Sequence, residues 1–291
     1  MSLQSFTTRL LFILTILSTA GVSHAEVQSL LLDKPTKLDG LLYHNGQLYG
    51  AAGWDGSLIH AIDSDGKVTN VGVIPRGPID MVADNKGNLI ITSYGSNSVY
   101  RLNIDSGEKE KIVTLPSFAG AIATYRPGEY LIGSASRLYW INEQGDYKVY
   151  VKDLDQIDNP TGLVVDGTGR IYVGNLNRST ILVIDDESRD ISMLATLPNA
   201  GNHNIGKLAL HKGVLYATHL SQEVVYAVDT DSGDIQIFAG QENVQGQVDG
   251  QRQQATLTSP NGLALDAKRQ VLWIAQGYGP VKHLRTLDLA E

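Results

Sequence analysis

The chain of 291 residues contains no cysteine. This absence excludes disulfide bonds, thiolate catalysis and zinc sites built from cysteine. Basic residues are in the minority, since 23 Lys and Arg face 31 Asp and Glu, and they form no cluster. The resulting net charge of −8 argues against a nucleic-acid partner and against binding to anionic membrane surfaces. Stability must therefore come from a hydrophobic core, which a chain of this length can bury.

Long apolar runs are lacking as well, apart from one near the start. Within residues 1–25, the single charge of Arg9 precedes an apolar run that ends before Ser23-His24-Ala25. This layout predicts a secretory signal peptide, because the run is too short to span a bilayer; a retained anchor is the competing interpretation. We expect an exported product, periplasmic or secreted, whose domain comprises residues 26–291 and does not insert into a membrane after signal removal.

A sustained helical period is also missing, and short strand-like runs repeat instead. Runs of four to seven residues rich in Val, Ile, Leu and Tyr alternate with turns of Gly, Asn and Asp. A small or acidic anchor residue opens each unit, at intervals of 40, 40, 42, 44 and 56 residues. The anchors are Gly40, Asp80, Gly120, Gly162, Gly206 and Gly262. Six units of four antiparallel strands predict an all-β, six-bladed β-propeller.

The sixth unit is one strand short, because the chain ends after "VKHLRTLDL". The missing strand is predicted at the other end, where "EVQSLLL" (Glu26–Leu32) is similar to the fourth strands of other units. Pairing of this segment with the last strand would close the ring and remove an open sheet edge. The anchor glycines are expected to let the inner strands approach closely at the centre.

The units resemble the NHL repeat, most clearly in "AGQENVQGQVDGQRQQATLTSPNGLALD" (Ala239–Asp266). More widely, they are similar to the six-bladed calcium-dependent propellers, which include gluconolactonase-like and paraoxonase-like lactonases and strictosidine-synthase-like proteins. The resemblance covers the whole of residues 26–291. It implies the propeller fold, but not one activity, because propellers carry many.

One face of the propeller is expected to carry function. Loops such as "HNG" and "DSDG" are ordinary hairpin turns, whereas the loops of the opposite face carry aromatic, amide, carboxylate and imidazole groups. Such groups at the mouth of a central channel are typical of a binding site, although loop geometry alone also favours Asn and Asp. The predicted ligand-binding residues are Trp54, Asp55, Arg76, Tyr94, Asn175, Asn177, Arg178, Asn204, Gln276 and Tyr278.

The resemblance to the lactonases implies Ca²⁺ at the channel mouth, held by carboxylate and amide oxygens. Asn261 matches an asparagine position of that family, whereas Asp39 stands where the family usually has a glutamate. The predicted metal ligands are Asp39, Asp80, Asn159 and Asn261, a partial set. His203 or His219 could serve as general base, although a structural surface histidine is the competing interpretation.

Two interpretations follow from the sequence. In the first, an exported NHL-like propeller binds a small ligand or a protein partner at the channel-mouth face without chemistry. In the second, the protein is a calcium-dependent hydrolase of lactones or related esters. The incomplete metal set favours the first; a structural subunit of an envelope assembly is a third possibility.

Overall fold

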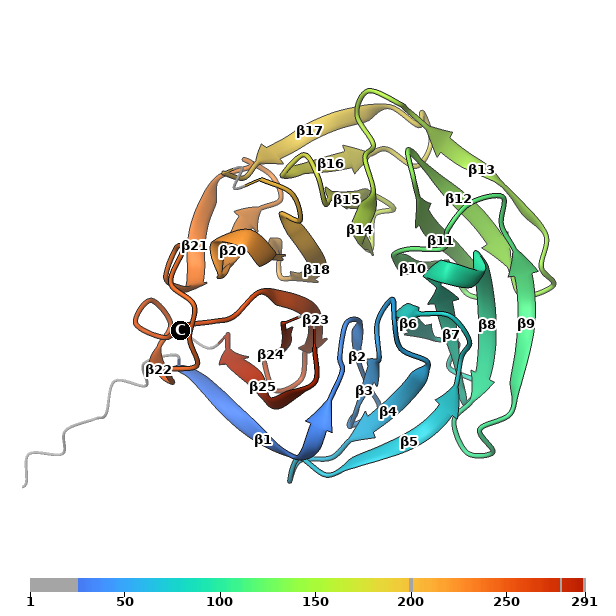
Figure 1. Ribbon diagram of the computed structural model, residues 1–291. Coiled ribbons are helices and arrows are strands. Elements are labelled where there is room, and N and C mark those ends of the chain that lie inside the picture. Colours follow the sequence, from blue (N-terminus) through green and yellow to red (C-terminus); the bar gives the residue numbers. More distant parts are fainter. Residues whose placement is uncertain (1–25, 199–200, 278, 290–291) are drawn as a thin grey trace, which may run out of the picture.

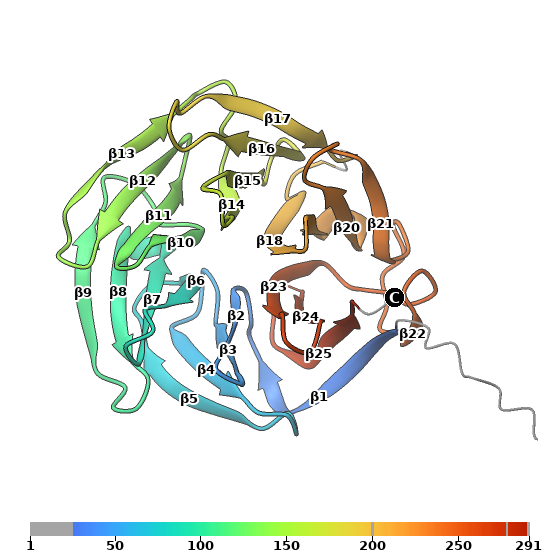
Figure 2. The same cartoon turned by 180° about the vertical axis from the view of Figure 1, so that it is seen from behind.

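The fold is a closed ring of six β-sheets around a central axis (Figure 1). The computed structural model describes residues 26–198, 201–277 and 279–289; the predicted signal peptide lies outside them. Five sheets have four antiparallel strands in sequence order, with the first strand near the centre of the ring and the fourth at the periphery (Figures 1 and 2). The predicted six-bladed propeller is confirmed.

The strands of the first three blades follow one another without a crossover. Blade 1 contains β2 (Leu41–His44), β3 (Gln47–Ala51), β4 (Leu58–Ile62) and β5 (Val68–Val73). Blade 2 contains β6 (Pro78–Ala83), β7 (Asn88–Ser93), β8 (Ser98–Asn103) and β9 (Lys109–Thr114). Blade 3 contains β10 (Ile122–Arg126), β11 (Glu129–Ser134), β12 (Arg137–Asn142) and β13 (Tyr147–Lys152).

The next two blades repeat this order. Blade 4 contains β14 (Pro160–Val165), β15 (Ile171–Asn175), β16 (Thr180–Ile184) and β17 (Ile191–Thr196). Blade 5 contains β18 (Ile205–His211), β19 (Val214–His219), β20 (Val224–Asp229) and β21 (Ile235–Gly240). The two helices of the described residues are single 3-10 turns, η1 (Tyr94–Ser96) and η2 (Leu220–Gln222), and neither is long and apolar enough to cross a membrane.

Blade 6 is completed by the other end of the chain, as predicted. Its strands are β23 (Pro260–Asp266), β24 (Val271–Gln276), β25 (Val281–Asp288) and β1 (Glu26–Thr36), with the two-residue β22 (Gly250–Gln251) at the edge. β1 pairs antiparallel with β25, in a register that places Val27 opposite Leu287 and Leu31 opposite His283 (Figure 1). The closure therefore joins segments at opposite ends of the sequence.

A hydrophobic cluster fills each of the six interfaces between neighbouring blades. Between blades 1 and 2, for example, Ile59 packs with Leu89 and Ile91, all fully buried. Blades must therefore approach closely near the axis, where the anchor glycines lie. A Cβ on Gly262 would lie 2.1 Å from the Asp39 carbonyl oxygen, and one on Gly40 would lie 2.5 Å from that of Ile79. These contacts explain why a side chain is excluded there.

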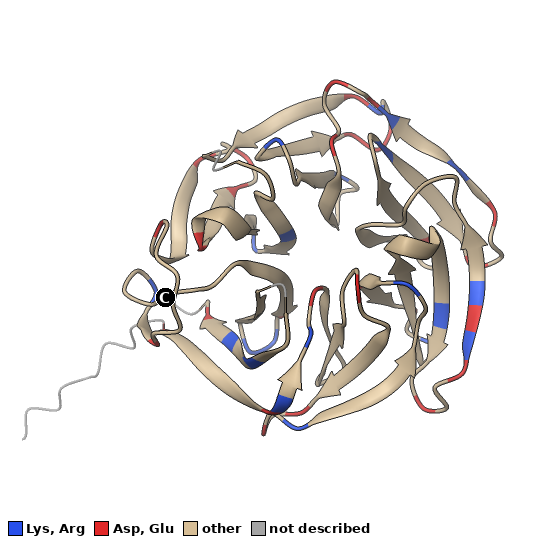
Figure 3. Cartoon of the chain, in the orientation of Figure 1, with Lys and Arg blue, Asp and Glu red and all other residues tan. Residues whose placement is uncertain are grey.

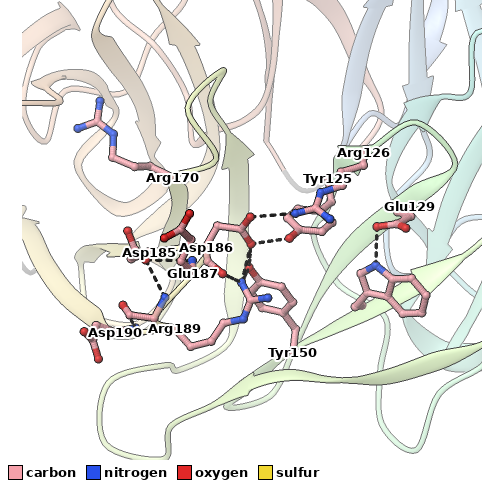
Figure 4. A network of polar contacts seen from close by, with 12 residues as sticks. Tyr125, Arg126, Glu129, Tyr150, Arg170, Asp185, Asp186, Glu187, Arg189 and Asp190 are labelled. Carbon is pink, nitrogen blue, oxygen red and sulfur yellow. Dashed lines mark hydrogen bonds and ion pairs between the residues drawn. The ribbon is translucent and has the colours of Figure 1, made fainter.

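Charged residues are distributed around the ring (Figure 3). Some of their contacts lie within one blade, such as Arg101–Glu110 in blade 2, and others join two blades. The Asp186 carboxylate, in the turn between β16 and β17, accepts hydrogen bonds from the Tyr125 and Tyr150 hydroxyls of blade 3, each at 2.5 Å (Figure 4). Arg189 approaches the same carboxylate at 2.5 Å and stacks its guanidinium over the Tyr150 ring. Together these contacts fasten blade 3 to blade 4.

Candidate functional site

A small pocket lies at the seam between blades 1 and 6. The centres of water-sized molecules can occupy about 20 Å³ of it, and the space around them is open to solvent. Blade 1 and the connection from β1 supply most of the wall, and the start of β23 and the loop after β24 supply the rest. The lining residues are Lys37, Leu38, Asp39, Ala52, Gly53, Trp54, Asp55, Asn261, Gly277 and Gly279. Four predicted site residues, Asp39, Trp54, Asp55 and Asn261, thus share one pocket.

The floor of the pocket is a hydrogen-bonded pair, one residue from each blade. Asn261 Nδ2 donates to Asp39 Oδ1 at 2.7 Å. The backbone of Asp39 is held by a bond from its N–H to the Ala51 carbonyl, at 2.8 Å. Gly53, in a left-handed conformation, brings the next loop over the carboxylate, because a Cβ there would lie 3.1 Å from Asp39 Oδ2. The pair is therefore positioned from both sides of the seam.

Burial raises the pKa of the Asp39 carboxyl to about 6. The Lys207 ammonium and the Asn261 hydrogen bond oppose this rise, whereas the Asp80 carboxylate adds to it. A carboxyl group whose pKa lies near neutrality can exchange a proton under physiological conditions. The floor of the pocket can therefore present either a charged acceptor or a neutral donor.

The rim of the pocket is an aromatic ring beside an ion pair. The Trp54 side chain is 64% exposed, although it is a large apolar group. Asp55 forms an ion pair with Lys37, which lowers the pKa of the Asp55 carboxyl. An exposed indole next to polar groups gives a flat surface on which a ligand can stack.

Lys207, which the sequence analysis did not single out, is not among the residues that line the pocket. It lies on β18 of blade 5, yet its ammonium is 3.0 Å from Asp80 Oδ2, on β6 at the opposite side of the ring (Figure 1). Both side chains are nearly buried, at 7% and 12% exposure. The strand register places Lys207, rather than the predicted Gly206, at the anchor of blade 5, because Leu208 pairs with Ala217 as Leu163 does with Val173 and Leu263 with Ile274.

Asp80 itself stands at the same anchor place in blade 2, where blades 4 and 6 have Gly162 and Gly262. Its Oδ1 accepts from the Met81 backbone N–H at 3.0 Å, and its Oδ2 accepts from that of Ile122 at 3.2 Å. Together with Lys207, these donors occupy both oxygens. The carboxylate links blades 2, 3 and 5.

These residues do not fit the calcium site that the resemblance implies. A calcium ion requires six to eight oxygen ligands around one point. Here an ammonium already lies against Asp80, and Asp39 binds the amide of Asn261. Asn159 begins blade 4, and no hydrogen bond joins it to Asp39 or Asp80 in the described part of the chain. Within that part, no three His, Asp or Glu side chains form a group that could hold a metal ion.

Two predicted ligand-binding residues, Asn175 and Gln276, form hydrogen bonds with the backbone of blade connections. The last residue of the second strand is polar and buried in five of the six blades: Ser93, Ser134, Asn175, His219 and Gln276. Asn175 donates to the Gln156 carbonyl at 2.7 Å and accepts from the Asp158 N–H at 3.0 Å. Gln276 accepts from the Thr258 N–H at 2.8 Å. These side chains fix the connections that form the face.

The two predicted histidines lie in different environments. His219 is fully buried; its Nε2 donates to the Pro198 carbonyl at 2.9 Å, while its Nδ1 has no hydrogen-bond partner. Burial lowers the pKa of His219, so the ring is neutral. His203 is exposed, and its backbone carbonyl accepts from the Ser221 hydroxyl. Neither lines the pocket, and their role as general base stays a prediction.

The remaining predicted residues lie further around the face. Arg76 and Tyr94 lie next to Trp54 along this face, because their chain neighbours make the contacts: Gly77 lies against the Trp54 carbonyl, and Gly95 lies against Arg76. The Tyr94 ring stacks on Phe118. On blade 4, Asn177 and Arg178 bind Asp158. Asn204 is buried and donates to the Gly201 carbonyl at 2.8 Å. Tyr278 lies outside the described residues.

Comparison with known proteins gives similarity of fold. No protein-family model and no curated protein matches the sequence. Among solved structures, an auxiliary nutrient binding protein from Bacteroides thetaiotaomicron superposes with a TM-score of 0.72 at 14% identity, over 90% of this chain and 76% of that one. A gluconolactonase from Xanthomonas campestris gives 0.69 at 16% identity, over 91% and 90% of the two chains.

A virginiamycin B lyase from Staphylococcus aureus gives a TM-score of 0.64 at 16% identity, over 91% of this chain and 99% of that one. These three proteins carry different functions on one architecture, so the likeness does not select among activities. Together with the six closed sheets, it establishes that this chain is a six-bladed β-propeller.

Proposed function

We propose that this protein is an exported binding propeller that holds a small polar ligand in the pocket between blades 1 and 6. The observation that carries the proposal is the combination of the exposed Trp54 ring with the half-buried Asp39–Asn261 pair in one hollow. The ring offers a stacking surface, and the pair offers hydrogen-bonding groups whose positions are fixed before a ligand arrives.

The charges of the site favour a ligand that is small and neutral overall. Lys37 compensates Asp55, and Lys207 compensates Asp80, which leaves Asp39 as the carboxylate with an amide rather than a cation as its hydrogen-bond partner. A ligand with hydroxyl or amide groups can donate to Asp39 and cover Trp54. The nutrient-binding neighbours support a binding role at the level of the fold.

The test is a thermal-shift and calorimetric screen with small polar metabolites, including sugars, amino acids and lactones. A ligand at one hundred times its Kd stabilises the protein by about 2.7 kcal/mol, which such a screen detects. Trp54→Ala should weaken binding at least tenfold. Tyr147→Ala, which removes an exposed aromatic ring from the outer strand β13, is the matched control and should leave the affinity unchanged. Equal affinities of both variants and the parent protein would refute the proposed pocket.

A lactone or ester hydrolase is the second candidate, because the Asp39 carboxyl has a pKa suited to proton transfer. The gluconolactonase neighbour supports it at the level of the fold. In this candidate, Asp39 holds or releases the proton and Asn261 orients the carboxyl. A lactone panel, assayed with and without calcium, tests it: Asp39→Asn should abolish turnover. Turnover that survives in both Asp39→Asn and Asn261→Ala would exclude this site.

A further inference from the structure

Lys207 places a charge where most blades have none. By strand register it occupies the place of Gly162 in blade 4 and Gly262 in blade 6, since Leu208 pairs with Ala217 as Leu163 does with Val173 and Leu263 with Ile274. Asp80 occupies the same place in blade 2, and Lys207 is 6% exposed. Burial of an ammonium is unfavourable unless it is paired and hydrogen-bonded, so its presence requires a reason beyond packing.

The side chain is held at both ends. At the backbone, the Thr218 hydroxyl accepts from the Lys207 N–H at 2.8 Å and contacts the Asn261 carbonyl oxygen at 2.8 Å. At its tip, the ammonium reaches Asp80 across the ring, at 3.0 Å. Lys207 is therefore fixed by blades 2 and 5, and its main chain is tied to the residue that binds Asp39.

The charge balance at the centre depends on this lysine. Two carboxylates, Asp39 and Asp80, lie close enough to repel each other, and the Lys207 ammonium attracts both. In the calcium-dependent propellers that the repeats resemble, a divalent ion provides the positive charge at the channel mouth. Here the donor set does not fit that ion, but a cation that belongs to the chain lies among the carboxylates.

We propose that Lys207 is a built-in cation that replaces a bound metal ion at the centre of this propeller. It neutralises Asp80, compensates Asp39 and links opposite blades, so the channel-mouth site is complete without calcium. The proposal concerns the charge of the site and does not depend on which ligand the pocket binds.

The test compares the protein with its Lys207→Met variant, in which a side chain of similar length lacks the charge. In EDTA and in millimolar calcium chloride, the parent protein should have the same Tm. K207M should melt several degrees lower in EDTA, because Asp80 loses its partner. Calcium should restore part of that loss, and the double variant K207M/D80N should lose the calcium response. Lys212→Met, which removes an exposed lysine of the same blade, is the control and should behave as the parent.

A rise in the Tm of the parent protein with calcium, or a fall with EDTA, would overturn the proposal. So would a K207M variant that responds to calcium no more than K212M. If K207M does not fold, calorimetric titration of the parent protein with calcium decides: no heat of binding supports the built-in cation, and saturable binding refutes it.

Discussion

Asp39→Asn should make this protein more stable at neutral and alkaline pH, although it alters the floor of the pocket. The folded-state pKa of Asp39 is raised from 3.8 to about 6, so folding favours the protonated carboxyl. The protonated carboxyl therefore stabilises the fold fully below pH 3.8, and this stabilisation is lost as the pH rises through 6. The difference between the two pKa values corresponds to about 3 kcal/mol of unfolding free energy, which the parent protein lacks above pH 7. Asparagine carries no charge and keeps the oxygen that accepts from Asn261.

Urea unfolding of both proteins at pH 4, 6 and 8 measures the effect. The free energies of unfolding should be nearly equal at pH 4, and the variant should gain stability progressively towards pH 8, up to about 3 kcal/mol. Asp55→Asn is the control: it changes an exposed carboxyl of the same pocket whose pKa is lowered by Lys37, so it should not increase stability. A D39N gain that is absent, or independent of pH, would refute the burial of an ionisable Asp39.

Two further predictions concern the fold. Asp186→Asn should lower the free energy of unfolding by about 1–3 kcal/mol at pH 7, because Tyr125, Tyr150 and Arg189 lose a charged acceptor. The pKa of Asp186 is lowered in the folded protein, so the charged carboxylate stabilises the fold at neutral pH. In urea titrations, the difference in unfolding free energy between the variant and the parent should shrink as the pH falls below 3.8. Deletion of residues 26–32 should abolish the cooperative thermal transition seen by circular dichroism, because β25 would become an open edge; an unchanged Tm would contradict closure by β1.

Much of the fold was predictable because its physical causes are local and repeated. Glycine anchors recur where one inner strand approaches the next too closely for a Cβ, as at Gly40 and Gly262. The closure was predictable because blade 6 lacked one strand and "EVQSLLL" had the pattern of a fourth strand. In the first case only glycine fits the close approach of two strands, and in the second only a segment of strand length completes the last sheet.

The site was only partly predictable, because a polar residue in a loop can serve either a ligand or the backbone. Asp39 and Asn261 were identified from the variable position before the anchor, and they do meet. Asn175 and Gln276 have equally polar side chains, but these bind the backbone of blade connections. Which neighbour a side chain reaches depends on where a carbonyl or N–H of another blade lies, and the sequence does not encode that position locally.

The pocket and the closure of the ring are parts of one seam. β1 completes blade 6 and ends at Thr36, and the chain then enters blade 1 and reaches Asp39. Asn261, at the start of the adjacent blade, binds Asp39 across that seam. A ligand that contacts Trp54 and Asn261 would therefore hold blades 1 and 6 together. Because such a ligand binds only the closed ring, it stabilises closure by the free energy of its binding, and the two ends of the chain are coupled to the occupancy of the site.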